Sequence, residues 1–258
     1  MAVATVNGVR LYYEERGTGT PILGIHGAGS SAIFWQDAAE RLSALGRVIV
    51  YDRRGCSRSE RPEPYETTSV REHAIDAREL LRTLDAAPAV LIGRSLGATI
   101  ALDVALGHPE SVLGLALLEG GPEGLSQEAD AWFASLRDRL EALAAAGRVE
   151  EAGEVVIRDV LGAWEELPET FRETFTTNSP ALLAEVRGGE RLDTSRLATL
   201  RVPALVVTAE DSPTFIQSGS HALGRALPDA RTVRVPGGHV IDPAGPEVLA
   251  FVGELVAR

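Results

Sequence analysis

"AVLIGRSLGATIALDVAL", residues 89–106, decides the fold that we expect for this chain. Its first four residues are apolar and typical of a buried strand, whereas residues 98–106 have the length and composition of an apolar helix. Between them, Gly93 to Gly97 fit the pattern G-x-S-x-G. In a strand-to-helix context this pattern predicts a strained turn that exposes the hydroxyl of Ser95 at the sheet edge. Ser95 is therefore the first candidate for a reactive residue.

The rest of the chain shows a similar alternation of strands and helices. Residues 3–17 alternate apolar and polar side chains around Asn7-Gly8, which predicts a hairpin with a tight turn. Nearly continuous Val/Ile/Leu runs follow, as expected of parallel strands that are buried on both faces. These runs lie at residues 21–27, 46–52, 89–95, 112–120, 203–211 and 231–238. Helix-like segments between several of them indicate an α/β fold with a parallel sheet and helices on both sides.

One region, from about residue 120 to about residue 200, contains no good strand. Its apolar side chains recur at helical spacing, for example at Trp132, Leu136 and Leu140. This pattern predicts a helical insertion between two strands, and not a second domain with a sheet of its own.

Composition excludes several classes of function. The net charge of −12 argues against nucleic acid or an anionic membrane as a partner, since phosphates require basic side chains. The single cysteine, Cys56, excludes an internal disulfide, and five scattered histidines without an HExxH pair give no reason to expect a metal site. Because no signal-like or membrane-length apolar segment is present, we expect a cytoplasmic protein.

A serine needs a base to become a nucleophile, and His239 is the best candidate. It follows a predicted strand, in a glycine-rich loop just before an apolar helical segment. Developing negative charge on a substrate oxygen also needs two hydrogen-bond donors. One donor would be the backbone N–H of Leu96, directly after Ser95. That of Ala28, in the glycine-rich segment 26–31, would be the other.

Taken in order, these motifs resemble the α/β-hydrolase fold family over nearly the whole chain. The resemblance rests on the hairpin, "HGAG" (26–29), "YDRRGCSRS" (51–59), "GRSLG" (93–97), the helical insertion and "PGGH" (236–239). It implies an eight-stranded, mostly parallel sheet, with a core of residues 1–120 and 200–258 and a helical cap of residues 121–199 after strand six. It also implies the nucleophile Ser95, the base His239, the amide donors Ala28 and Leu96, and no cofactor. Members with an aspartate nucleophile are excluded by Ser95.

The sequence offers two candidates for the acid of a Ser-acid-His triad. In most family members it ends strand seven in a pattern like Gly-x-x-Asp, and here that position holds Ser212, with Asp211 one residue early. A shift by one residue at a strand end turns a side chain to the other face. Glu119 ends the preceding strand, where some subfamilies that look similar, such as zearalenone lactonases, take their acid. We favour Glu119 as the acid. Asp211 remains the alternative, because a loop can bring its side chain into place.

The resemblance implies serine-dependent hydrolysis of a small carboxylic ester or lactone. A C–C bond hydrolase, a cofactor-free perhydrolase and a non-catalytic small-molecule receptor are the alternatives. Trp164, in the middle of the insertion, is the candidate for substrate binding. Cys56 is expected to pack without reacting, and Asp52 and Arg53 are expected to fix their own loop through hydrogen bonds.

Overall fold

The computed structural model describes residues 2–188 and 192–257. The predicted boundaries at residues 1 and 258, and residues 189–191 of the predicted cap, lie outside the described residues. The described residues form one eight-stranded sheet in the order β1-β2-β4-β3-β5-β6-β7-β8. Its strands are β1 (Ala2–Val6), β2 (Val9–Arg16), β3 (Pro21–Ile25), β4 (Arg47–Tyr51), β5 (Ala89–Arg94), β6 (Val112–Leu118), β7 (Ala204–Ala209) and β8 (Ala230–Val235).

The sheet is mostly parallel, as the sequence predicted. Strands β1 and β2 form the expected antiparallel hairpin, and β2 also pairs with β4 in antiparallel fashion. All other pairs, from β4 through β3, β5, β6 and β7 to β8, are parallel. The predicted fold class is therefore confirmed.

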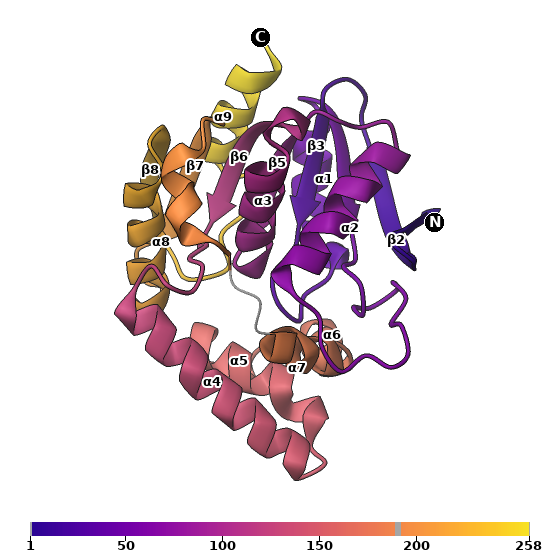
Figure 1. Ribbon diagram of the computed structural model, residues 1–258, viewed down its shortest axis with the longest axis vertical. Coiled ribbons are helices and arrows are strands. Elements are labelled where there is room, and N and C mark those ends of the chain that lie inside the picture. The colour runs from indigo at the N-terminus through magenta and orange to yellow at the C-terminus, as the bar shows by residue number, and fades with distance from the viewer. Residues whose placement is uncertain (1, 189–191, 258) are drawn as a thin grey trace.

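Helices cover both faces of the sheet (Figure 1). Buried side chains of α2, α3 and α8 pack with one face, and those of α1 and α9 pack with the other. The helices are α1 (Gln36–Leu42), α2 (Val70–Thr83), α3 (Leu96–Gly107), α4 (Gln127–Ala145), α5 (Ala152–Leu161), α6 (Glu169–Thr177), α7 (Ser179–Gly188), α8 (Thr214–Ala226) and α9 (Pro246–Val256).

Strand β5 shows why these apolar runs form central strands. Leu91 contributes to the core on one face, and its neighbours Val90 and Ile92 contribute to the core on the other. All three side chains are fully buried. Each such side chain contributes about 1.5–3 kcal/mol through removal from water, so a strand with two apolar faces is stable only between two helical layers.

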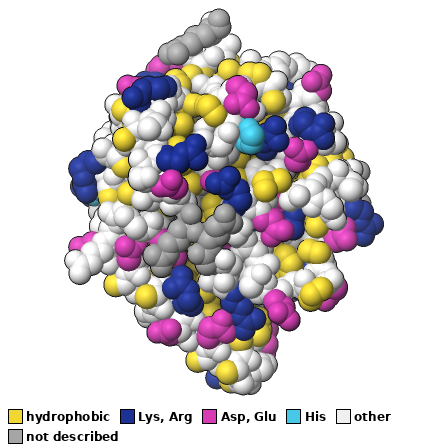
Figure 2. Space-filling model, viewed as in Figure 1, with side chains coloured by type: hydrophobic (Ala, Val, Ile, Leu, Met, Phe, Trp, Pro, Cys, Tyr) yellow, Lys and Arg dark blue, Asp and Glu magenta, His cyan; other side chains and the backbone are white. Residues whose placement is uncertain are grey.

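The helices α4 to α7 lie between β6 and β7 in the chain and form a separate layer across the carboxyl ends of the parallel strands (Figure 1). A backbone hydrogen bond of 3.0 Å from Thr68 N to Ala184 O joins this layer to the segment before α2. Within the described residues, no helix is both long enough and apolar enough to span a membrane. On the face drawn in Figure 2, basic and acidic side chains are interspersed.

Candidate active site

Ser95 sits at a sharp elbow between β5 and α3. Its backbone has φ 54° and ψ −122°, a conformation that residues other than glycine rarely adopt. Glycines on both sides make the elbow sterically feasible: a Cβ on Gly93 would lie 2.3 Å from the carbonyl oxygen of Gly97, and a Cβ on Gly97 would lie 2.1 Å from that of Ile25. The structure thus gives Ser95 the strained geometry that the sequence predicted for it.

Glu119 and His239 meet although they are far apart in the sequence. Glu119 directly follows β6, and His239 lies in the loop after β8. His239 Nδ1 lies 3.0 Å from Glu119 Oε2. Because an ionised carboxylate only accepts hydrogen bonds, Nδ1 carries the proton in this contact and Nε2 remains the basic nitrogen.

The carboxylate of Glu119 is fully buried, and other donors help to offset the cost of removing its charge from water. The backbone N–H of Ala209 donates to Oε1 at 2.6 Å, and the hydroxyl of Ser212 donates to Oε2. The backbone of Glu119 itself has φ 54°, a second strained position at the end of a central strand. Hydrogen bonds from β7 and from the loop that follows β7 therefore stabilise the buried carboxylate of this strained residue.

Asp211 does not take part in this arrangement. It is exposed, and its backbone N–H donates to Gly237 O at 2.9 Å. Ser212, one residue later, is buried and points at Glu119. The position where most family members carry the acid is thus filled by a hydroxyl that supports the carboxylate from the neighbouring strand.

The two candidate amide donors lie beside Ser95. Ala28 and Leu96 line the same cavity as Ser95, Glu119 and His239. Leu96 is the first residue of α3, so its N–H has no partner within the helix. In the described part of the chain, neither amide donates a hydrogen bond to another protein group. Among the same residues, no hydrogen bond joins Ser95 to His239.

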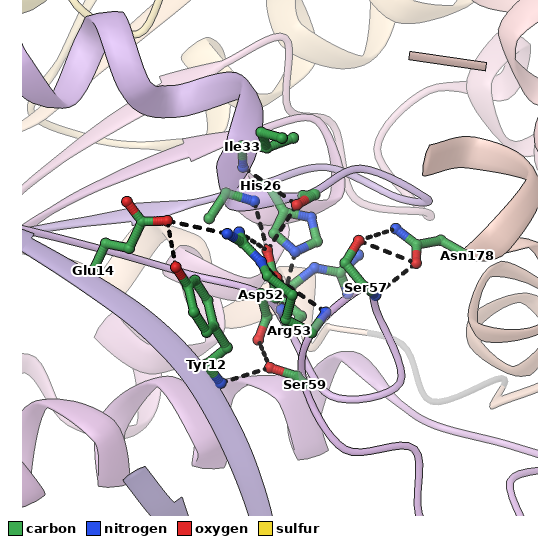
Figure 3. Close-up of polar contacts among 12 residues, drawn as sticks. Tyr12, Glu14, His26, Ile33, Asp52, Arg53, Ser57, Ser59 and Asn178 are labelled. Carbon is green, nitrogen blue, oxygen red and sulfur yellow. Dashed lines mark hydrogen bonds and ion pairs between the residues drawn. The ribbon is translucent and has the colours of Figure 1, made fainter. Parts of the chain in front are cut away.

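A buried polar network fixes the loop that carries Ala28 (Figure 3). The N–H of Arg53 donates to His26 Nε2 at 3.0 Å, and His26 Nδ1 lies 2.8 Å from Gly27 O. Burial, together with the charge of Arg53, lowers the pKa of His26 from 6.5 to about 3, so this ring is neutral. Asp52 accepts from the hydroxyl of Ser31 and from the N–H of Ala32, both at 2.8 Å.

The cavity in front of Ser95 has a volume of about 210 Å³ and a mainly apolar lining. Aromatic rings from α4, α6 and α8 form much of its wall. The largest, Trp132, stacks on Phe215 with ring centroids 4.4 Å apart. The aromatic lining residues are Trp132, Phe133, Phe171, Phe175 and Phe215. Carbonyl chemistry at Ser95 would thus take place beside a largely apolar space.

Trp164 is not among the residues that line this cavity. It packs with Ile157, Val160 and Phe175 and borders a separate, shallow surface pocket. Helix α5 ends at Leu161 and is capped by Gly162 in the left-handed conformation, and Trp164 lies beyond this cap. Trp132, one of the apolar residues at helical spacing in the insertion, lines the cavity. Cys56 is fully buried, and burial raises the pKa of its thiol to about 12, which fits a packing role.

Comparison with known proteins agrees with this fold. A family model described as the alpha/beta hydrolase fold matches residues 20–241. The chain is 31% identical to RutD of Azorhizobium caulinodans, provisionally named a carbamate hydrolase, over 95% of this chain and 96% of that protein. It is 28% identical to the 2-(acetamidomethylene)succinate hydrolase of Mesorhizobium japonicum, over 94% and 90% of the two chains.

Solved structures give similar matches. Est816, an N-acyl homoserine lactone degrading enzyme, superposes with a TM-score of 0.72 at 26% identity, over 99% of both chains. A thermophilic esterase from Thermogutta terrifontis superposes with a TM-score of 0.80 over 98% of both chains. At 24% identity, the latter is a likeness of fold alone.

Proposed function

Because the chain belongs to the α/β-hydrolase family of enzymes, we propose that it is a serine hydrolase that cleaves carboxylic esters or lactones. The observation that carries the proposal is the 3.0 Å contact between Glu119 and His239, in a cavity that Ser95 also lines. Ser95 is the proposed nucleophile, His239 the base and Glu119 the acid. A cytoplasmic location, and the division into a core and a cap of residues 121–199, remain part of the proposal.

The proposed reaction begins with proton transfer from Ser95 Oγ to Nε2 of His239. The bond from Nδ1–H to Glu119 holds the ring in the tautomer that leaves Nε2 free, and the carboxylate stabilises the imidazolium that forms. Ser95 Oγ attacks the carbonyl carbon, and the N–H groups of Ala28 and Leu96 stabilise the oxyanion.

Collapse of the tetrahedral intermediate expels the alcohol, which takes its proton from His239 Nε2–H. An acyl group then remains on Ser95. His239 next accepts a proton from water, whose oxygen attacks the acyl carbon, and the carboxylic acid leaves as Ser95 regains its proton. In a lactone the alcohol and the acid are parts of one product.

The lining of the cavity supports an apolar group on the substrate. Aromatic and aliphatic side chains of α4, α5 and α6 surround the space in front of Ser95, and apolar groups leave water most readily in such a site. The relatives named for lactone, carbamate and other hydrolases support hydrolysis of a small molecule.

The test is a panel of p-nitrophenyl esters of increasing acyl length, N-acyl lactones and an aryl carbamate. Wild type should hydrolyse some of them, and Ser95→Ala should lose activity by about 10⁴-fold or more because triad members act as a unit. Ser43→Ala, at the end of α1, is the control for the serine-to-alanine change and should keep full activity. Saturable binding without turnover across the panel would favour a receptor instead.

A further inference from the structure

The Ala28 N–H belongs to the same planar peptide group as the carbonyl of Gly27. Any group that holds the Gly27 oxygen therefore also sets the direction of the Ala28 N–H. Three donors reach this oxygen: the ring of His26 at 2.8 Å, the guanidinium of Arg53 at 3.0 Å and the backbone N–H of Ser30 at 3.3 Å. Only the Arg53 donor carries a positive charge, since the ring of His26 is neutral.

Arg53 is well placed to act on this peptide. Its side chain is fully buried, in the loop after β4. Nη2 donates to Gly27 O, and its own backbone N–H donates to His26 Nε2 at 3.0 Å. A charged donor at a carbonyl oxygen gives a stronger hydrogen bond than a neutral one. It also polarises the peptide, which makes the N–H at the other end a better donor.

The other terminal nitrogen of the same guanidinium, Nη1, faces the inserted helices. Arg53 Nη1 lies 2.5 Å from Glu185 Oε1 and 3.0 Å from His73 Nε2. Glu185 belongs to α7, is nearly buried, and lines the cavity in front of Ser95. One guanidinium thus joins the Ala28 peptide to a carboxylate in the wall of the cavity.

We propose that Arg53 is a positioning residue for oxyanion stabilisation, which it serves by orienting and polarising the Gly27–Ala28 peptide while Glu185 holds its guanidinium in place. This inference rests on the proposed function, because it assigns Ala28 N–H the oxyanion. It goes beyond the fixing of a loop, since it makes the strength of a catalytic hydrogen bond depend on a side chain that does not touch the substrate.

The experiment compares an ester with its thionoester, whose sulfur is a poor hydrogen-bond acceptor and gains little from the two amides. The main variant is Arg53→Met combined with Glu185→Leu, since replacing both partners of a buried ion pair leaves no unpaired charge. Arg53→Lys is the second variant: it keeps the charge, but one ammonium replaces the two-nitrogen fork. Arg61→Met is the matched control, because Arg61 also links the loop after β4 to the inserted segment, through Gly55 O and Thr177 O, without touching Gly27.

Thermal unfolding and circular dichroism establish that each variant folds. We expect kcat/KM for the ester to fall by about tenfold or more in the double variant and by a smaller factor in Arg53→Lys, with the thionoester changing by less than about threefold. Changes in the shape of the cavity affect both substrates alike and cancel in their ratio. An unchanged ratio of ester to thionoester rates in folded variants would overturn the inference while leaving serine hydrolysis intact. A loss in Arg61→Met equal to that in the Arg53 variants would overturn it as well.

Discussion

His239 Nδ1 lies 3.0 Å from Oε2 of Glu119, across 120 positions of sequence. Glu119, the proposed acid, follows β6, whereas the resemblance to the family implies an acid after β7 in most members. The hydroxyl of Ser212, after β7, donates to the same Oε2 atom. In this chain, therefore, one strand end supplies the carboxylate and the next supplies a neutral donor that holds it.

The first prediction concerns this carboxylate. Glu119→Gln should lower kcat on a p-nitrophenyl ester by about 10⁴-fold, because a neutral amide neither stabilises the imidazolium nor fixes the productive tautomer. Asp211→Asn should change kcat by no more than about threefold, since Asp211 is exposed. Both variants are measured under the same conditions, at about pH 8. An inactive Asp211→Asn beside a nearly normal Glu119→Gln would transfer the role to Asp211.

A second prediction concerns Ser212. Ser212→Ala removes a donor to a buried charge, a contact worth about 1.5–3 kcal/mol, and should lower kcat by about tenfold as Glu119 becomes less well held. Ser220→Ala is the matched control: it removes a buried serine on α8 whose hydroxyl donates at 3.0 Å to the backbone of Gly120. We expect the control to lower the unfolding temperature without lowering kcat. Equal losses of kcat in both variants would show that Ser212 serves the fold alone.

A third prediction separates two tryptophans. Trp132 lines the cavity and stacks on Phe215, whereas Trp164 lies outside it. Trp132→Ala should shift the ratio of kcat/KM between bulky and short esters by about tenfold, because it enlarges an apolar wall. Trp164→Ala should lower stability and leave that ratio unchanged. If Trp164→Ala alters the ratio and Trp132→Ala does not, the cavity wall that contacts the substrate has been assigned to the wrong tryptophan.

A fourth prediction concerns acid stability. The folded state lowers the pKa of His26 from 6.5 to about 3, so between these values the unfolded chain binds the proton more readily. The contribution of the neutral His26 ring to the free energy of unfolding is therefore complete above about pH 6.5 and declines as the pH falls below that value. The unfolding temperature of wild type should therefore drop between about pH 7 and about pH 5. His26→Gln should drop less over the same range, and His221→Gln, which alters an exposed histidine, should follow wild type.

The elbow could be predicted from sequence because its causes are local. An apolar strand, two glycines and an apolar helix lie within a few residues of Ser95, and close packing leaves little room for anything larger at Gly93 and Gly97. The hairpin at Asn7-Gly8 and the parallel strands follow in the same way from short-range patterns. From sequence, the choice between Glu119 and Asp211 depends on which residue ends each strand, and a shift of one residue there turns a side chain to the other face.

The wall of the cavity could not be predicted in the same way. Trp132 and Trp164 both lie in the helical insertion, and which of the two lines the cavity depends on the tertiary packing of α4 on α8 and on the path of the chain after α5. Trp164 follows the left-handed cap residue Gly162 and lies outside helix α5. The contact from Arg53 to Gly27 O is equally non-local, since the motif "DRRG" does not predict which group the guanidinium of Arg53 contacts.

The most direct test of the central claim is to label the protein with a fluorophosphonate and locate the adduct by peptide mass spectrometry. A phosphonylating reagent bonds covalently to an activated serine whose base and oxyanion donors are in place. We predict one adduct, on Ser95, formed rapidly in wild type and Asp211→Asn and slowed by about 10³-fold or more in Glu119→Gln. An adduct on another residue, or labelling that is equally fast in Glu119→Gln, would contradict it.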